Sequence, residues 1–210
     1  MNVLTDCGQL ILESDSAETR EEIEGGENIK ESEGCSLGYL GDAYKELHCY
    51  EEAIEAYKQS IAIAQSIGNR RTEGISRGNV GDLLYKTNRY EEAKEELQKA
   101  ISLCDVTIPA ASGAFRGSLA RILVRENNMD AALLLIKKGE LQVQSYAEEY
   151  GKFLCKKALI EKIAQRLKQA KKTLDQAKQM ASELKISDES EFGKLLVVTT
   201  KSIDKISPCD

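Results

Sequence analysis

A short motif that occurs twice constrains the fold of this chain more than any other feature. The string Tyr-Glu-Glu-Ala stands at residues 50–53 and again at 90–93, a separation of 40 residues. Each copy follows a Gly-Asp pair at the same offset, Gly41-Asp42 in the first and Gly81-Asp82 in the second. Chance similarity would not keep these offsets over two helices. The stretch from residue 34 to residue 105 therefore contains one predicted helical hairpin written twice.

Small residues at fixed positions explain how the two helices of such a hairpin can pack. Gly41 and Ala53 allow a close approach of the two backbones, and we expect Leu40, Tyr44 and Tyr57 to fill the seam between them. One hairpin alone cannot bury this seam. Copies of the hairpin are therefore expected to stack into an array.

The spacing of these residues resembles the tetratricopeptide repeat, whose pattern is a large apolar residue, Leu-Gly, Tyr, Ala and then an aromatic residue. The longer period, together with the string Gly78-Asn79-Val80-Gly81, is similar to the subclass found in kinesin light chains, Pins-type scaffolds and bacterial signalling proteins. The resemblance implies an all-α fold, a right-handed α-α superhelix of hairpins. It also implies an adaptor that binds a peptide or protein segment on its concave surface without catalysis.

A recurring glycine divides the chain. Gly34, Gly74, Gly113, Gly151 and Gly193 follow one another at separations of 40, 39, 38 and 42 residues. Because glycine inside a helix costs about 1 kcal/mol relative to alanine, we expect each to allow a close approach to the neighbouring repeat. The predicted repeats are residues 34–73, 74–112, 113–150 and 151–188. The fourth places Lys157 and Glu161 where apolar residues are expected, which puts its local packing in question.

The two ends of the chain are expected to differ from the repeats. Residues 1–33 predict either a degenerate acidic helix that caps the first hairpin or a partly disordered arm, and the Gly25-Gly26 pair is expected to break the residues before it from those after it. Residues 189–210 predict a capping helix and tail. The apolar residues expected to face inward from this last helix are Phe192, Leu195, Leu196 and Val198.

Charge is distributed unevenly along the chain. Residues 1–34 carry ten acids against Arg20 and Lys30, a balance of -8, whereas residues 151–185 carry ten bases against three acids, a balance of +7. The alternative function is therefore self-assembly into a homo-oligomer, with the acidic N-terminal end of one copy stacked on the basic C-terminal end of the next. Aromatic residues for base stacking are scarce in the basic stretch, so neither nucleic acid nor a membrane is the expected partner.

Several other classes of function lack a sequence signal. The six cysteines have no CxxC spacing, and no apolar secretory segment follows Met1, so we expect a cytoplasmic protein with reduced thiols. His48 is the only histidine and is interpreted as a turn residue, because no second or third metal ligand accompanies it. Glu51 and Glu91 stand where acids complement the start of a helix. The expectation is a protein without a catalytic site, bound metal or cofactor.

The concave groove is the remaining candidate site, and the resemblance implies that the first helix of each hairpin lines it. In similar scaffolds the asparagine that matches Asn79 hydrogen-bonds the ligand backbone, while Lys86, Arg121 and Arg125 would steer an acidic ligand. All of these are otherwise simply exposed helix positions. The projected groove residues are Gly38, Asp42, Lys45 and Glu46, then Gly78, Asn79, Asp82, Tyr85 and Lys86, then Gly117, Arg121 and Arg125, and finally Leu159 and Lys162.

Overall fold

The computed structural model describes the backbone of residues 3–205 and the side chains of residues 25–205. Within that range all regular structure is α-helical, which confirms the predicted fold class. The elements are α1 (Val3–Glu46), α2 (Tyr50–Ser66), α3 (Arg70–Lys86), α4 (Tyr90–Thr107), α5 (Pro109–Arg125), α6 (Met129–Val143), α7 (Ala147–Ile163), α8 (Leu167–Glu183) and α9 (Glu191–Asp204).

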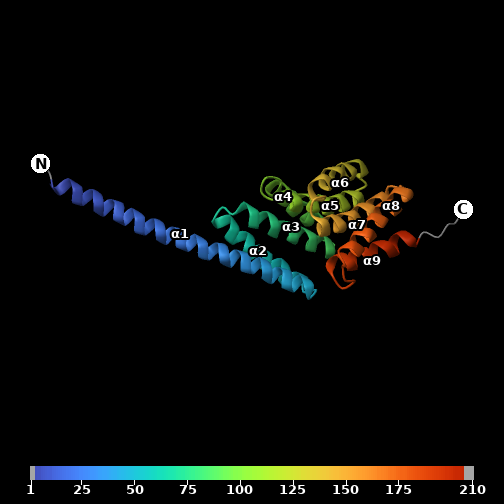
Figure 1. The fold of residues 1–210 in the computed structure, drawn as a ribbon, viewed down its shortest axis with the longest axis horizontal. Helices are drawn as coiled ribbons and strands as arrows, with labels where there is room; N and C mark the ends of the chain where they lie inside the picture. The colour runs from blue at the N-terminus through green and yellow to red at the C-terminus, as the bar shows by residue number, and fades with distance from the viewer. Residues whose placement is uncertain (1–2, 206–210) are drawn as a thin grey trace.

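The helices form four antiparallel hairpins that stack into an α-α superhelix (Figure 1). The hairpins are α1 with α2, α3 with α4, α5 with α6, and α7 with α8, and α9 packs on α7 and α8. The first helix of one hairpin also contacts the first helix of the next, as α5 does with α7. These contacts place α1, α3, α5, α7 and α9 along one side of the array.

Most turns close with one residue in the left-handed region, where helices commonly end. These residues are His48, Gly68, Asn88, Asn127, Gln165 and Lys185, with φ between 54° and 69°. After α1, for example, the Cys49 N–H donates to the Tyr44 carbonyl at 3.0 Å and the His48 N–H donates to the Lys45 carbonyl at 3.1 Å. His48 is therefore a turn residue, as predicted.

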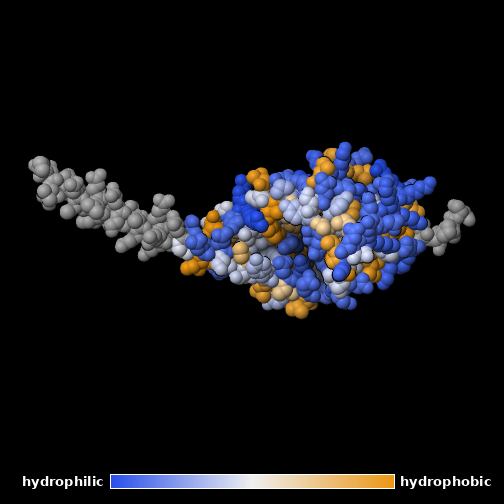
Figure 2. All heavy atoms as spheres, in the orientation of Figure 1, coloured by the Kyte–Doolittle hydropathy of each residue, from blue (hydrophilic) through white to orange (hydrophobic). Residues whose placement is uncertain are grey.

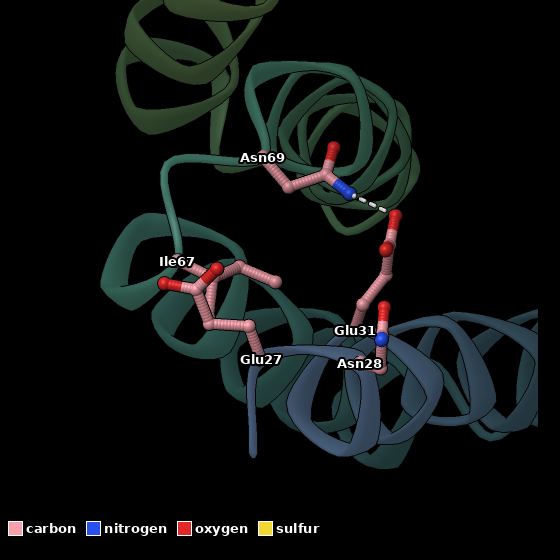
Figure 3. Close-up of a pocket in the computed structure, with 5 residues that line it drawn as sticks. All are labelled: Glu27, Asn28, Glu31, Ile67 and Asn69. Carbon is pink, nitrogen blue, oxygen red and sulfur yellow. Dashed lines mark hydrogen bonds between the residues drawn. The ribbon is translucent and has the colours of Figure 1, made fainter. Parts of the chain in front are cut away.

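The turn between α2 and α3 also contacts the preceding helix. The Asn69 side chain accepts a hydrogen bond from the Thr72 N–H at 3.0 Å and so caps α3. Its amide nitrogen donates to Glu31 Oε1 on α1 at 2.8 Å, beside Glu27, Asn28 and Ile67 (Figure 3). The turn thus ties α1 to the second hairpin.

The expectation that Gly25-Gly26 separates two segments is wrong. α1 continues through both residues and is 44 residues long. A Cβ at either glycine would meet nothing within 4 Å, so neither residue serves a close packing contact. Two glycines cost about 2 kcal/mol of helix propensity relative to alanine, which weakens a helix without ending it. The side chains of residues 1–24, on which the capping hypothesis depends, lie outside the described residues.

Two apolar residues expected in the interior are exposed. Leu40 on α1 is 43% exposed, whereas Val80 at the same position of α3 is 1% exposed. The difference arises because a hairpin precedes α3 and none precedes α1 among the described residues. Val198 on α9 is also exposed, and Thr199 and Ile203 are buried there instead. Tyr57 is buried in the first seam, as predicted.

Close contacts at the marker glycines lie mainly inside each hairpin, whereas contacts between repeats had been expected. A Cβ on Gly34 would lie 3.2 Å from the Ile63 side chain, and one on Gly74 would lie 2.7 Å from Cys104 Sγ. Gly113 likewise faces the backbone of its own second helix. These glycines let the two helices of a hairpin approach closely. Only Gly151 faces the next repeat, through the Phe192 ring.

Each of the three phenylalanines of the chain packs against a glycine on the first helix of the preceding hairpin. Two of them lie on first helices, α5 and α7, and the third lies on α9. Phe115 covers Gly78, Phe153 covers Gly117, and Phe192 covers Gly151. These rings are at most 6% exposed. A Cβ on Gly78 would overlap the Phe115 ring, so this contact between hairpins requires glycine.

The unexpected charges of α7 are accommodated by partners on other helices. Lys157 Nζ donates to both carboxylate oxygens of Glu140 on α6 at 2.8 Å. Glu161 is 5% exposed and accepts a hydrogen bond from Thr173 Oγ1 on α8 at 2.7 Å. The predicted register of this hairpin therefore holds, with Ala158 buried at its packing position.

We predict opposite effects for alanine at two equivalent glycines. Gly78→Ala should lower the free energy of unfolding by about 1–3 kcal/mol, because the new methyl group displaces Phe115. Gly38→Ala is the matched control: its Cβ would lie 3.7 Å from Ser60 Oγ, an ordinary contact. The control should be neutral or up to about 1 kcal/mol more stable through helix propensity. Urea unfolding of both variants measures the difference, and equal effects would contradict the packing described here.

Glu161 leads to a prediction about pH. Burial raises the pKa of this carboxyl group above its ordinary value, and the Thr173 hydroxyl only partly offsets the shift. A raised pKa means that the protonated carboxyl group favours the folded state relative to the ionised one. This contribution to folding stability is fully present below the pKa of the unfolded state and is lost as pH rises through the pKa of the folded state. Glu161→Gln should therefore melt at a higher temperature than the natural protein at pH 7, and this advantage should shrink at pH 4. An advantage that does not change with pH would refute the assignment.

Candidate functional site: a groove along the first helices

A groove of about 700 Å³ runs along the concave side of the array. It is lined by the C-terminal end of α1 and by α3, α5, α7 and α9, so segments far apart in the sequence meet there. The space-filling view shows a hollow between the N-terminal and C-terminal hairpins (Figure 2). The volume falls within the range of about 300–1,000 Å³ that is usual for ligand sites.

The floor of the groove is apolar. The N-terminal half of α5 contributes Ala110, Ala111, Ala114 and Phe115. Pro109 occupies the first turn of this helix, and mostly small residues follow it. Phe153 of α7 continues the floor. An apolar side chain of a ligand could bury its surface here, at about 25 cal/mol for each Å² removed from water.

Charged side chains surround this floor, and some already have partners. Lys152 lies 2.6 Å from Glu149 and 3.2 Å from Glu191, which joins α7 to α9. These carboxylates raise the pKa of Lys152, although burial alone would lower it. Lys45 similarly lies 3.3 Å from Asp42.

Four cations of the groove have no carboxylate within ion-pair distance in the described part of the chain. They are Lys86, Arg121, Lys156 and Lys194. Lys156 Nζ instead donates to Ser118 Oγ at 2.7 Å. Two carboxylates of the lining, Glu46 and Asp82, likewise have no cation within ion-pair distance among the described residues, so the unpaired side chains leave an excess of two positive charges beside an apolar floor.

Five of the predicted ligand residues line this groove, and Glu46 does so as well. The five are Lys45, Asn79, Asp82, Lys86 and Arg121. The others lie outside the lining residues: Gly38, Asp42, Gly78, Tyr85, Gly117, Arg125, Leu159 and Lys162.

Contacts within the protein explain several of these placements. Phe115 covers Gly78 and Phe153 covers Gly117, so neither glycine offers an open backbone to a ligand. Asp42 accepts a hydrogen bond from the Tyr57 hydroxyl at 2.6 Å. Lys162 donates to the Ser202 carbonyl on α9 at 2.7 Å.

The predicted aromatic and arginine anchors stack on one another along consecutive hairpins. The Arg121 guanidinium lies 4.2 Å from the centre of the Tyr85 ring, and that of Arg125 lies 4.1 Å from the centre of the Tyr90 ring. Lys86 Nζ lies 5.6 Å from the centre of the Tyr50 ring, which is the equivalent pair one repeat earlier. Such contacts contribute about 0.5–2 kcal/mol each, and they hold Lys86 and Arg121 at the groove edge.

The sequence analysis did not identify several groove residues that lie on α5, α7 and α9 or directly before these helices. Phe115, Phe153, Tyr146 and Lys156 belong to this set. A usable signal existed, because Phe115 and Phe153 each stand two residues after a marker glycine. Their equivalents in the first two repeats are polar, so the register gave no reason to place them in the groove.

Other chemistries have little support in the described residues. No group of three potential metal ligands occurs among them. His48 lies on the groove wall, with its Nδ1 3.1 Å from the Tyr50 hydroxyl. Of the helices that could be searched, none is long and apolar enough to cross a membrane.

Comparisons with known proteins agree with this architecture. The tetratricopeptide repeat family model matches residues 32–105. No curated protein matches the sequence. Such repeats are generally protein-interaction scaffolds and are typically non-catalytic.

Solved structures extend the similarity beyond the matched repeats. BtubC (BKLC) from P. vanneervenii is similar over 73% of this chain, with 13% identity and a TM-score of 0.59. This chain covers 65% of the length of that protein. Two structures of a putative kinesin light chain from Podosopora anserina, with nearly identical TPR-like repeats, have TM-scores of 0.57 and 0.56. Each is 16% identical and matches over 84% of this chain and 89% of its own.

The two hairpins within residues 32–105 thus carry both the sequence pattern and the packing of the family, and the hairpins after them continue the same fold. Residues 32–105 match the tetratricopeptide repeat family, and the described chain as a whole folds as an all-α superhelix similar to solved structures with TPR-like repeats.

Proposed function

We propose that this protein is a non-catalytic adaptor that binds an acidic segment of a partner protein in its concave groove. The observation that carries the proposal is the combination of an apolar floor with four cations that have no carboxylate partner in the described structure. A ligand that matches both features carries an apolar side chain with carboxylates close to it.

The position of the cations supports an acidic ligand over a neutral one. Arg121 and Lys86 lie at the groove edge near α3, whereas Lys156 and Lys194 lie on the α7 and α9 side. Glu46 and Asp82 offset the charge of the first pair, so the excess positive charge of the groove lies on the α7 and α9 side. Such an arrangement speeds the encounter with an acidic segment and disfavours a basic one.

Asn79 provides a polar contact of another kind. Its amide can donate and accept, which suits an extended peptide backbone. It lies near the Tyr57 hydroxyl, which donates to Asp42.

Binding should depend on Arg121 and not on Arg125. Full-length natural protein is first used for affinity capture, and the captured segment is then made as a synthetic peptide. We expect Asn79→Ala combined with Arg121→Ala to weaken peptide binding about tenfold or more, because a charged hydrogen bond contributes about 1.5–3 kcal/mol. Fluorescence anisotropy measures the affinity, and circular dichroism checks that helicity is unchanged.

Arg125→Ala is the matched control for this experiment. Arg125 stacks on Tyr90 as Arg121 stacks on Tyr85, yet it does not line the groove. Its removal should leave the affinity within about twofold. If the Asn79 and Arg121 double variant binds the peptide as tightly as the natural protein does, the groove assignment is wrong.

A further inference from the structure

One face of α1 exposes apolar side chains along a single helical stripe. The stripe consists of Ile29, Ser36, Leu40, Ala43 and Leu47, and we refer to it as the α1 end face. Ile29 and Leu47 are each 70% exposed, and Leu40 is 43% exposed. Successive members are spaced by three, four or seven residues, so they lie on the same side of the helix.

The equivalent stripe of α3 is buried between hairpins. Ser76, Val80 and Leu83 correspond to Ser36, Leu40 and Ala43, and each is at most 2% exposed. Val80 and Leu83 belong to the apolar core that joins the first two hairpins, and Ser76 Oγ lies 3.0 Å from Ser60 Oγ on α2. The α1 end face therefore has the register of an inter-hairpin docking face, but no described residue covers it.

The opposite end of the array has a different character. The outward side of α9 carries Lys201 and Lys205, with the exposed Val197 beside them, whereas Lys194 of the same helix lines the groove. Such a lysine-bearing side is suited to water and would lose hydration against an apolar stripe. The surface of a second copy that best matches the α1 end face is therefore the α1 end face of that second copy.

We propose that two copies of the chain associate through their α1 end faces, with the two helices antiparallel. The spacing of residues 29, 36, 40 and 47 is symmetric about residue 38. In an antiparallel pair, Ile29 of one copy faces Leu47 of the other, Leu40 faces the small Ser36, and Ala43 faces Glu33 at the edge of the contact. One patch can thus complement itself, as a two-fold interface requires.

Charge selects the antiparallel arrangement. Residues 1–34 carry a balance of -8, from ten acids and two bases. A parallel pair would align these segments side by side, whereas an antiparallel pair directs them to opposite ends. Ile29, Ser36, Leu40, Ala43 and Leu47 are absent from the lining of the groove, although Leu47 lies between Glu46 and His48, which line it.

Sedimentation velocity of the full chain over a range of concentrations tests the dimer. The natural protein should show a dimer fraction that rises with concentration and persists at high salt, since the contact is apolar. Leu40→Glu combined with Leu47→Glu should weaken association about tenfold or more, because carboxylates would be buried without partners. Both residues are exposed in one copy, so circular dichroism should show a folded variant.

Leu134→Glu combined with Leu141→Glu is the matched control. These residues of α6 are 55% and 66% exposed and lie far from the proposed contact in sequence. The control pair should associate as the natural protein does. Equal loss of association in the control would overturn the proposal.

A mixing experiment separates this dimer from head-to-tail stacking. Tagged Leu40→Glu, Leu47→Glu protein should not retain untagged natural protein, because a two-fold contact needs both end faces intact. Retention would show that the intact C-terminal end docks on the natural α1, and the proposal would be wrong. A natural protein that stays monomeric at every concentration would also overturn it.

Discussion

The array depends on one repeated contact, a phenylalanine ring packed on a glycine of the preceding first helix. Phe115 on Gly78 is the clearest case, because a methyl group at the glycine would occupy the position of the ring. The contact brings successive first helices close on the concave side, while the second helices fill the convex side. Phe115 also forms part of the groove floor. The packing that curves the array therefore also forms the surface available to a ligand.

Polar contacts fix the hairpins relative to one another where apolar packing is not specific. Arg116 on α5 is 9% exposed and donates to both oxygens of Asp105 on α4, at 2.6 and 2.7 Å, and to Gln142 on α6. The guanidinium holds the pKa of Asp105 well below its ordinary value, so this stabilisation is lost only as pH falls. Arg77, one repeat earlier, instead contacts Glu73 on its own helix and Glu96 on α4. The arginine at this position therefore joins two hairpins in one repeat and the two helices of a single hairpin in the other.

The sequence pattern predicted the repeat, its fold and most of its turns, because each depends on local spacing. Five of the projected ligand residues, including Asn79 and Arg121, line one groove, and their role in binding stays a prediction. It could not show that Phe115 covers Gly78, since that contact joins helices whose relative rotation no spacing reveals. The exposure of Leu40 was not predicted for a related reason. The repeat pattern of the first hairpin is the same as that of the second. The two differ only because no described hairpin precedes the first one. The continuity of α1 through Gly25-Gly26 reflects the weakness of glycine as a helix terminator without other stop signals.

The most direct test of this packing measures Gly78→Ala in a protein that already carries Phe115→Ala. If the ring is the reason for the glycine, removing the ring should convert the destabilisation by Gly78→Ala into a gain of up to about 1 kcal/mol from helix propensity. Chemical unfolding of the two single variants and the double variant gives the required free energies. A Gly78→Ala substitution that costs the same with and without the Phe115 ring would contradict the account.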